Sequence, residues 1–252
     1  MRPGSEGLCP RGAHSSERRI GREDSTNQRR DPSGFSEEVE QVIRPFFCCF
    51  YAMNALKNTV NYPVKINPAL LGFDFDGVIA DTAEIFLRLA CEDYGLCDLT
   101  REDIVNFEVE QCLSLDRTQV DALFTKVLLD SVGTGLQPME DAVDVLGELA
   151  ELSTISVITA RPLAAPVHDW FDAFFPASTC KAIRVTAMGA HDEKPRHIHK
   201  QNLQFFIDDR AETCVQLSKA GIQPFVFNQP WNHNRHQLPS VSSWRDIRDL
   251  IS

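Results

Sequence analysis

Side chains that carry oxygen follow three apolar runs of this sequence, at the point where each run ends. Asp74 and Asp76 follow the first run. Thr159 ends the second run, and the adjacent pair Asp208 and Asp209 ends the third. Short apolar runs separated by helical patterns indicate buried parallel strands. Because an open α/β sheet binds ligands outside the carboxyl ends of its strands, we expect these side chains to meet at one edge of a sheet.

Four carboxylates and one hydroxyl are expected at a single edge of the sheet, where the negative charges of the carboxylates repel one another. Like charges at short range disfavour the ionised forms, so the cluster requires a cation to compensate it. The ligands are hard oxygen atoms without Cys or His, which favours Mg²⁺ over softer metals. The pattern therefore predicts a magnesium site suited to phosphoryl transfer.

Strand and helix patterns alternate through the part of the chain that must position these residues. Strand patterns cover residues 69–73, 153–159, 182–186, 203–207 and 223–227. Helical patterns cover residues 84–94, 115–129, 142–152 and 212–220. Alternation of this kind predicts an α/β fold with a doubly wound, Rossmann-like parallel sheet. The helical block between the first two strands exceeds a simple crossover of about a dozen residues, so we interpret it as an inserted all-helical cap.

The sequence divides into three predicted parts. Residues 1–52 are expected to be disordered, because the first 36 residues are polar, rich in Arg and Ser, and without apolar periodicity. Two α/β core segments, 62–82 and 153–252, are expected to flank the helical cap, 83–152. Two alternatives for residues 1–52 are a targeting arm and a translated leader that precedes a start at Met53.

The bulk composition argues against several classes of protein. A formal net charge of −11 disfavours binding to nucleic-acid polymers, and an anionic substrate then requires a local positive site. No apolar stretch near the N-terminus is long enough to span a bilayer. The eight cysteines lack regular spacing, which indicates thiols in a reducing compartment. We therefore expect a cytoplasmic protein whose partner is a small phosphorylated metabolite, and the sequence predicts no oligomeric state.

The sequence resembles the haloacid dehalogenase-like superfamily over roughly residues 70–250. The resemblance rests on four motifs in the order of that superfamily: Asp74-x-Asp76-Gly77-Val78, Thr159, Lys194 and Asp208-Asp209. The helical insert resembles the type-one cap of the superfamily, which closes over small phosphate esters and excludes water. The first motif and the segments 227–232 and 243–247 also resemble cytosolic-type 5′-deoxynucleotidases.

The resemblance implies a role for each motif residue. Asp74 would be the nucleophile that forms an aspartyl-phosphate intermediate. Asp76 would protonate the leaving group and later deprotonate the attacking water. Thr159 and Lys194 would bind the phosphoryl group. Arg161 would either reach the substrate or simply begin a helix near solvent.

The resemblance also implies a set of metal ligands. These are the carboxylates of Asp74 and Asp209 together with the backbone carbonyl of Asp76. Asp208 is expected either to join the ligands or to orient Lys194 or a metal-bound water.

Lys194 and Lys200 compete for the lysine motif. Lys194 lies 14 residues before Asp208, a spacing that resembles many members of the superfamily, whereas Lys200 lies eight residues before it. A short helix beginning near Pro195 would place Lys194 at its N-terminal end, which favours anions. Lys200 would fall in the last turn, where a basic residue complements the helix dipole. We therefore predict Lys194.

The carboxyl group of Asp76 discriminates among the reactions of the superfamily. A halide leaves without protonation, so an acid at this position favours phosphate esters over haloacids. We expect Mg²⁺-dependent hydrolysis of a small phosphate monoester, either a nucleotide or a sugar or organic-acid phosphate. A phosphomutase and a non-catalytic binding protein that retains the fold are the alternatives. The binding protein is disfavoured, because carboxylates with no metal to hold would only destabilise the sheet edge.

Overall fold

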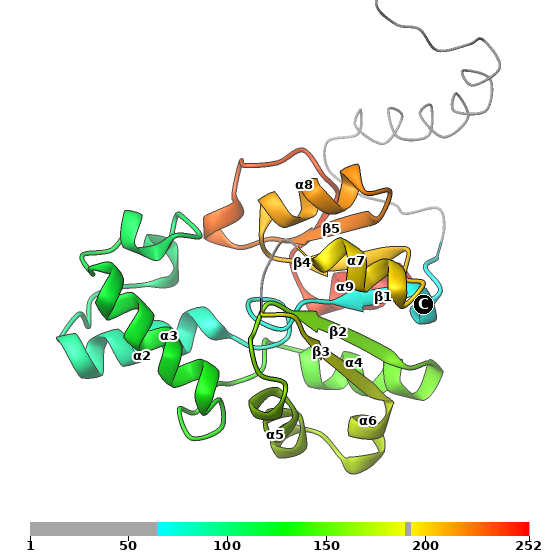
Figure 1. Ribbon diagram of the computed structural model, residues 1–252, viewed down its shortest axis with the longest axis horizontal. Coiled ribbons are helices and arrows are strands. Elements are labelled where there is room, and N and C mark those ends of the chain that lie inside the picture. The colour runs from blue at the N-terminus through cyan, green and yellow to red at the C-terminus, as the bar shows by residue number, and fades with distance from the viewer. Residues whose placement is uncertain (1–64, 190–192, 252) are drawn as a thin grey trace, which may run out of the picture. The chain divides into compact units, whose positions relative to one another are not determined.

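The computed structural model describes residues 65–189 and 193–251 of the chain (Figure 1). Our expectation of disorder for residues 1–52 therefore lies outside the described residues. No helix within the two described ranges is long and apolar enough to cross a membrane.

Parallel strands form a six-stranded sheet in the order β3-β2-β1-β4-β5-β6. The strands are β1 (Leu71–Phe73), β2 (Ile155–Thr159), β3 (Ile183–Ala187), β4 (Phe205–Asp208), β5 (Gln223–Phe227) and β6 (Ser240–Val241). The predicted doubly wound sheet is confirmed, since β1 lies inside the sheet and the chain winds outward from it in both directions. The two-residue β6 was not predicted, because so short a strand leaves no period to detect.

Helices connect the strands. The α-helices are α2 (Thr82–Tyr94), α3 (Arg117–Leu129), α4 (Ala142–Leu152), α5 (Ala165–Phe174), α6 (Ala177–Ala182), α7 (Lys194–Lys200), α8 (Ala211–Lys219) and α9 (Trp244–Ile251). Short 3₁₀ helices are η1 (Pro68–Leu70), η2 (Arg101–Asp103), η3 (Val109–Gln111) and η4 (Pro230–Asn232). The four predicted helical segments correspond to α2, α3, α4 and α8.

The sheet carries a separate apolar core on each face. One core contains Ile198 of α7, Leu217 of α8 and Phe206 of β4. The other contains Phe73 of β1 and Trp244 of α9, whose rings stack with their centroids 5.4 Å apart. Because side chains alternate along a strand, β4 contributes to both cores, with Phe206 in one and Ile207 in the other. The strand ends that carry the site residues are thereby held in fixed positions.

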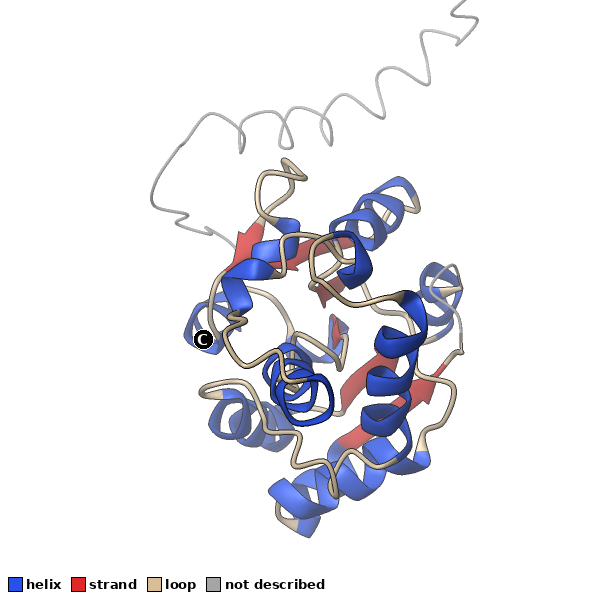
Figure 2. Cartoon of the chain, turned by 90° about the vertical axis from the view of Figure 1, so that its left-hand side faces the viewer, coloured by secondary structure: helices blue, strands red, loops and turns tan. Residues whose placement is uncertain are grey.

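An insertion leaves the sheet after β1 and contains α2 and α3, which pack against each other. Figure 1 shows both helices to the side of the strands, and Figure 2 views the chain from that side. The two connections of the insertion pair with each other: the Asp81 N–H donates to the Gln137 carbonyl, and the Met139 N–H donates to the Ile79 carbonyl, each at 2.8 Å. We therefore propose that the cap comprises residues 82–136. The following helix α4, which we expected in the cap, packs against β2 and α9 of the core.

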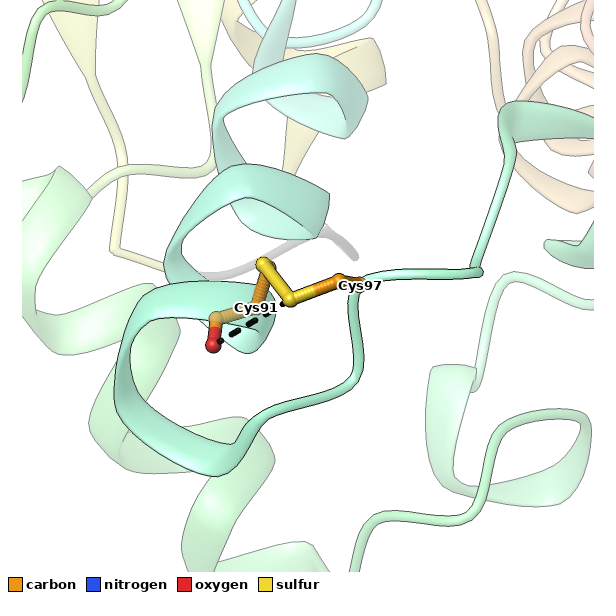
Figure 3. The surroundings of a disulfide bond; sticks show 2 residues. All are labelled: Cys91 and Cys97. Atoms are coloured by element: carbon orange, nitrogen blue, oxygen red, sulfur yellow. Dashed lines mark hydrogen bonds between the residues drawn. A yellow bond between two sulfur atoms is a disulfide. The ribbon is translucent and has the colours of Figure 1, made fainter.

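A disulfide joins Cys91 and Cys97 at the end of α2 (Figure 3). Our expectation of thiols is wrong for this pair. Gly95 adopts the left-handed conformation, with φ of +72°, and turns the chain back at the end of the helix. This turn brings the Cα atoms of the two cysteines to 4.3 Å from each other. Among the other described cysteines, Cys112, Cys180 and Cys214 are free thiols.

Candidate active site

Three buried carboxylates meet at the carboxyl ends of β1 and β4, which are neighbours in the sheet. One oxygen from each of Asp74, Asp208 and Asp209 lies within 4.8 Å of the other two. The structure thus brings together three of the four carboxylates predicted to converge. Their donor atoms are all oxygen, so the set fits a hard cation such as Mg²⁺.

Lys194 is the cation that this carboxylate cluster already contains. Its side chain is fully buried at the start of α7, with Nζ 2.6 Å from Asp208 Oδ2 and 2.9 Å from Asp74 Oδ2. Burial alone would lower the pKa of Lys194, but the carboxylates of Asp208 and Asp74 outweigh burial and raise it. Lys200 lies exposed at the other end of the same helix. The structure therefore places Lys194, and not Lys200, among the carboxylates.

The carboxylates of this cluster are difficult to ionise together. Burial raises the pKa of Asp74 from 3.8 to about 7, although the neighbouring Lys194 opposes the shift. Burial also raises the pKa of Asp209 well above its ordinary value, and the nearby Asp208 and Asp74 add to this effect. A bound cation would reverse both shifts, because it favours the charged form of each ligand.

Asp76 does not join the cluster, because its carboxylate is held by Arg161. Arg161 Nε donates to Asp76 Oδ2 at 2.8 Å, and Nη2 donates to Oδ1 at 2.7 Å. Thr82 Oγ1 donates to the same Oδ1 at 2.5 Å. Burial raises the pKa of Asp76, but the charge and hydrogen bonds of Arg161 outweigh it and leave the pKa below its usual value. The interpretation of Arg161 as a residue near solvent is wrong, since its exposed fraction is 2%.

Gly77 allows the loop after β1 to pass beside Asp209. Its φ is +70°, a conformation that side chains disfavour. A Cβ atom at this position would lie 2.3 Å from Asp209 Oδ2. The glycine of the first motif is thus required both by the backbone conformation and by the space that Asp209 occupies.

The segment after β5 holds the loop that contains Asp209. Trp231 Nε1 donates to Asp209 Oδ2 at 3.0 Å, and Asn232 Nδ2 donates to the Asp209 carbonyl at 2.7 Å. Gln229 Nε2 donates to the Gly77 carbonyl at 2.8 Å. These contacts explain why the 227–232 segment, noted from its resemblance alone, accompanies the first motif.

A cavity of about 310 Å³ opens above these residues. Asp74, Asp76, Thr159, Arg161 and Asp209 all line it, and so do residues of the insertion. Thr159 is buried at the end of β2, where its Oγ1 accepts a hydrogen bond of 3.2 Å from the Arg161 N–H. The predicted site residues therefore surround a space that a small molecule could fill.

Thr82 and Ser131 contact the site but were not predicted from the sequence. Thr82 lies in the sequence 81–84, which predicts only the capped start of a helix. The hydrogen bond from the Glu84 N–H to the side chain of Asp81 confirms this cap. Ser131 Oγ accepts a hydrogen bond of 2.7 Å from Arg161 Nη1. No pattern marks Ser131, because its place at the site depends on the path of the chain after α3.

A family model described as 5′ nucleotidase, deoxy (Pyrimidine), cytosolic type C protein matches residues 67–252. The chain belongs to this family. The predicted membership of the haloacid dehalogenase-like superfamily is confirmed, and the protein is a phosphatase of that superfamily.

Three proteins similar to this nucleotidase-family chain are at most 19% identical to it in sequence. A nucleotidase of Clostridium acetobutylicum is 19% identical over 180 residues, which cover 71% of this chain and 91% of the relative. The crystal structure of a dehalogenase with intermediate complex is similar with a TM-score of 0.51 at 13% identity, covering 75% of this chain and 99% of that one. A haloacid dehalogenase-like hydrolase of Streptococcus pneumoniae has a TM-score of 0.49 at 12% identity, with coverage of 71% and 96%. At such identities the dehalogenase shares the fold alone.

Proposed function

We propose that the protein hydrolyses a small phosphate monoester in a Mg²⁺-dependent reaction, and that Asp74 carries the phosphoryl group as an aspartyl-phosphate. The proposal rests chiefly on the buried set of Asp74, Asp208 and Asp209 with Lys194 between two of them. This set combines a nucleophile, an oxygen-only cation site and a phosphate-neutralising ammonium group. A binding protein would have no use for the nucleophile.

In the first half-reaction, an oxygen of Asp74 attacks phosphorus and the bond from phosphorus to the ester oxygen breaks. Asp76 gives a proton to the departing oxygen. Lys194 and Thr159 hold the phosphoryl oxygens, and the ammonium charge of Lys194 reduces the repulsion between the nucleophile and the phosphate.

In the second half-reaction, water attacks phosphorus and the bond to Asp74 breaks, releasing inorganic phosphate. Asp76 takes the proton from this water. The ion pair with Arg161 favours the carboxylate form of Asp76, which is the form that this step needs. A substrate that enters as its monoanion would pass its proton to the Asp76 carboxylate, and Asp76 would then give this proton to the departing oxygen in the first half-reaction.

Mg²⁺ would be held by the carboxylates of Asp74 and Asp209 and by the backbone carbonyl of Asp76. It would supply positive charge beside the nucleophile and the phosphoryl oxygens. Both oxygens of Asp208 already accept hydrogen bonds, one from Lys194 Nζ and one from the Arg210 N–H. This supports the alternative in which Asp208 orients the lysine rather than binding the metal.

The walls of the cavity favour a nucleoside monophosphate over a sugar phosphate. Four aromatic residues line the space: Phe86, Phe107, Phe124 and Trp231. Aromatic rings provide flat apolar area that suits a planar base better than a hydroxyl-rich sugar. The description of the matching family and the name of the clostridial relative support the same class of substrate.

A panel of phosphate esters tests both levels of the proposal. Purified protein is assayed for phosphate release from nucleoside 5′-monophosphates, hexose phosphates and phosphoglycolate, with Mg²⁺ and with EDTA. We expect hydrolysis only with Mg²⁺, and fastest for nucleotides. Absence of phosphate release from every ester would refute the reaction, and isomerised products would indicate the phosphomutase. A preference for hexose phosphate would refute the substrate class alone.

We also propose that the protein acts in the cytoplasm. The family description names a cytosolic protein, whereas the Cys91–Cys97 disulfide is more typical of oxidising compartments. Alkylation of free thiols in intact cells, followed by mass spectrometry, distinguishes the two. Reduced Cys91 in cells would agree with the cytoplasmic assignment, and a protected disulfide would contradict it.

A further inference from the structure

Every nitrogen of the Arg161 guanidinium donates a hydrogen bond to another side chain of the protein. Nε and Nη2 donate to the two oxygens of Asp76, and Nη1 donates to Ser131 Oγ at 2.7 Å. The bidentate contact fixes the plane of the Asp76 carboxylate as well as its position. Arg161 is therefore engaged in holding Asp76 rather than reaching toward a substrate.

Packing also holds the guanidinium plane of Arg161. The side chain of Arg161 is 1% exposed, and its Cζ atom lies 4.7 Å from the centre of the Phe75 ring. The carboxylate of Asp76 is different, since its side chain remains 30% exposed and lines the cavity. A fixed cation thus aligns an acid that faces the space for a substrate.

Both helices of the proposed cap contribute to this alignment. Thr82, the first residue of α2, donates directly to Asp76 Oδ1. Ser131, two residues after the end of α3, acts through Arg161. The Ser131 hydroxyl donates its proton to the Val127 carbonyl at 2.9 Å, so it presents a lone pair to Arg161.

We propose that Arg161 is a positioning residue that aligns Asp76 for proton transfer, and that Ser131 ties this alignment to the end of α3. The inference rests on the proposed function, in which Asp76 protonates the leaving oxygen. A misaligned acid would slow the cleavage of esters that need protonation of the leaving group. Esters with a good leaving group would be affected far less.

The test compares two esters in the full-length protein with Mg²⁺. Thymidine 5′-monophosphate has an alkyl leaving group that needs a proton, whereas 4-nitrophenyl phosphate has a stable leaving group that does not. The measured quantity is kcat/KM, which covers the steps up to the cleavage of the ester. In Arg161→Met we expect kcat/KM for the nucleotide to fall on the order of 10²-fold, and that for the aryl ester to fall less than about tenfold.

Two milder variants keep the inference falsifiable if Arg161→Met fails to fold. Arg161→Lys retains the charge but not the bidentate contact, and Ser131→Ala removes the hydroxyl that accepts from Arg161 and donates to the Val127 carbonyl. Both should show the same preference for the aryl ester, with smaller losses of a few fold. Thr125→Ala is the matched control, because Thr125 Oγ1 bonds the Asp121 carbonyl in the same i−4 manner but lies away from Arg161.

The outcomes separate this inference from the proposed function. Equal losses for the two esters would show that Arg161 serves the phosphoryl group or the fold, and would overturn the inference alone. Absence of turnover of both esters by the unmodified protein would overturn the proposed function, and the inference with it. Unchanged kcat/KM in all three variants would also overturn the inference.

Discussion

Two groups of residues at the cavity, named the floor and the wall, differ in the interactions that they make. The floor, defined as Asp74, Lys194, Asp208 and Asp209, consists of buried charges, of which Asp74 and Asp209 line the cavity. Lys194 is paired with two of its carboxylates. The wall, defined as the apolar residues of the proposed cap that line the cavity, consists of Ala83, Phe86, Ile104, Phe107, Val109, Val120, Phe124 and Leu128. Polar and charged residues of the same segment, such as Glu108, Arg117 and Asp121, also line the cavity. Removal of Lys194 would leave buried carboxylates without their cation, whereas trimming a wall residue would only reduce contact area. We infer that the floor determines the reaction and the wall selects the substrate.

The largest effect on activity is expected for Asp74→Asn in the floor. We expect turnover to be abolished, because an amide of nearly the same shape cannot act as the nucleophile. The fold should persist, since Lys194 keeps Asp208 as its partner. Phosphate release and thermal unfolding are measured together, with exposed Asp98→Asn as the control. Near-normal phosphate release by Asp74→Asn would show that the floor does not determine the reaction.

The next largest effect is expected for Lys194→Met. Loss of the buried ammonium removes charge neutralisation at the phosphoryl group, which should lower kcat on the order of 10²- to 10³-fold. Lys200→Met is the matched control, because it removes a lysine from the exposed end of the same helix and should change kcat little. Comparison of kcat for the two variants, after each is shown to be folded, checks the assignment. The reverse order of damage would identify Lys200 as the motif lysine.

A smaller effect is expected in the wall. Phe124 packs against Phe86, with ring centroids 4.9 Å apart, and both line the cavity. An aromatic contact contributes about 0.5–1.5 kcal/mol, so Phe124→Ala should raise KM for a nucleotide by up to about tenfold. The value of kcat should change much less. Tyr94→Ala, at the exposed end of α2, serves as a control outside the cavity. If Phe124→Ala lowered kcat and left KM unchanged, the division between floor and wall would be contradicted.

The smallest effect concerns pH and stability in the metal-free protein. The pKa of Asp74 is raised from 3.8 to about 7, so between these values the folded state holds a proton that the unfolded state has released. The contribution of Asp74 to the free energy of unfolding therefore falls as pH rises through this range. Mg²⁺ at the proposed site would bind the ionised form of Asp74, so the stabilisation of the protein by Mg²⁺ should be larger at about pH 8 than at about pH 5.5.

Thermal unfolding with and without Mg²⁺ at the two pH values measures this difference. Asp74→Asn is the informative comparison, since it lacks the titrating group. A larger increase in Tm at the lower pH would show that protons and Mg²⁺ do not compete for Asp74.

The parts predicted from the sequence are those in which a short local pattern fixes the geometry. The apolar runs before Asp74, Thr159 and Asp208 identified strands, and a parallel sheet then places the ends of its strands at one edge. The spacing to Asp208 and the position at a helix start predict Lys194 rather than Lys200, and the structure places Lys194 among the carboxylates.

The contacts that were missed join residues far apart in the sequence. Arg161 and Asp76 are separated by 85 residues, and only the pairing of β1 with β2 brings their two loops together. The disulfide depends on a left-handed turn at Gly95, whose consequence for Cys97 cannot be deduced from spacing. Helix α4 has an amphipathic pattern that does not reveal whether it packs on the cap or on the core.

The contact between Trp231 and Asp209 places a fluorescent side chain beside the candidate metal site. The chain contains three tryptophans, and the indole N–H groups of Trp170 and Trp244 donate to backbone carbonyls. The indole of Trp231 instead donates to a carboxylate oxygen of the cluster. A cation that draws this oxygen toward itself changes the electric field at the ring. The emission of Trp231 therefore provides an intrinsic fluorescent reporter of metal occupancy, which requires neither a substrate nor an added dye.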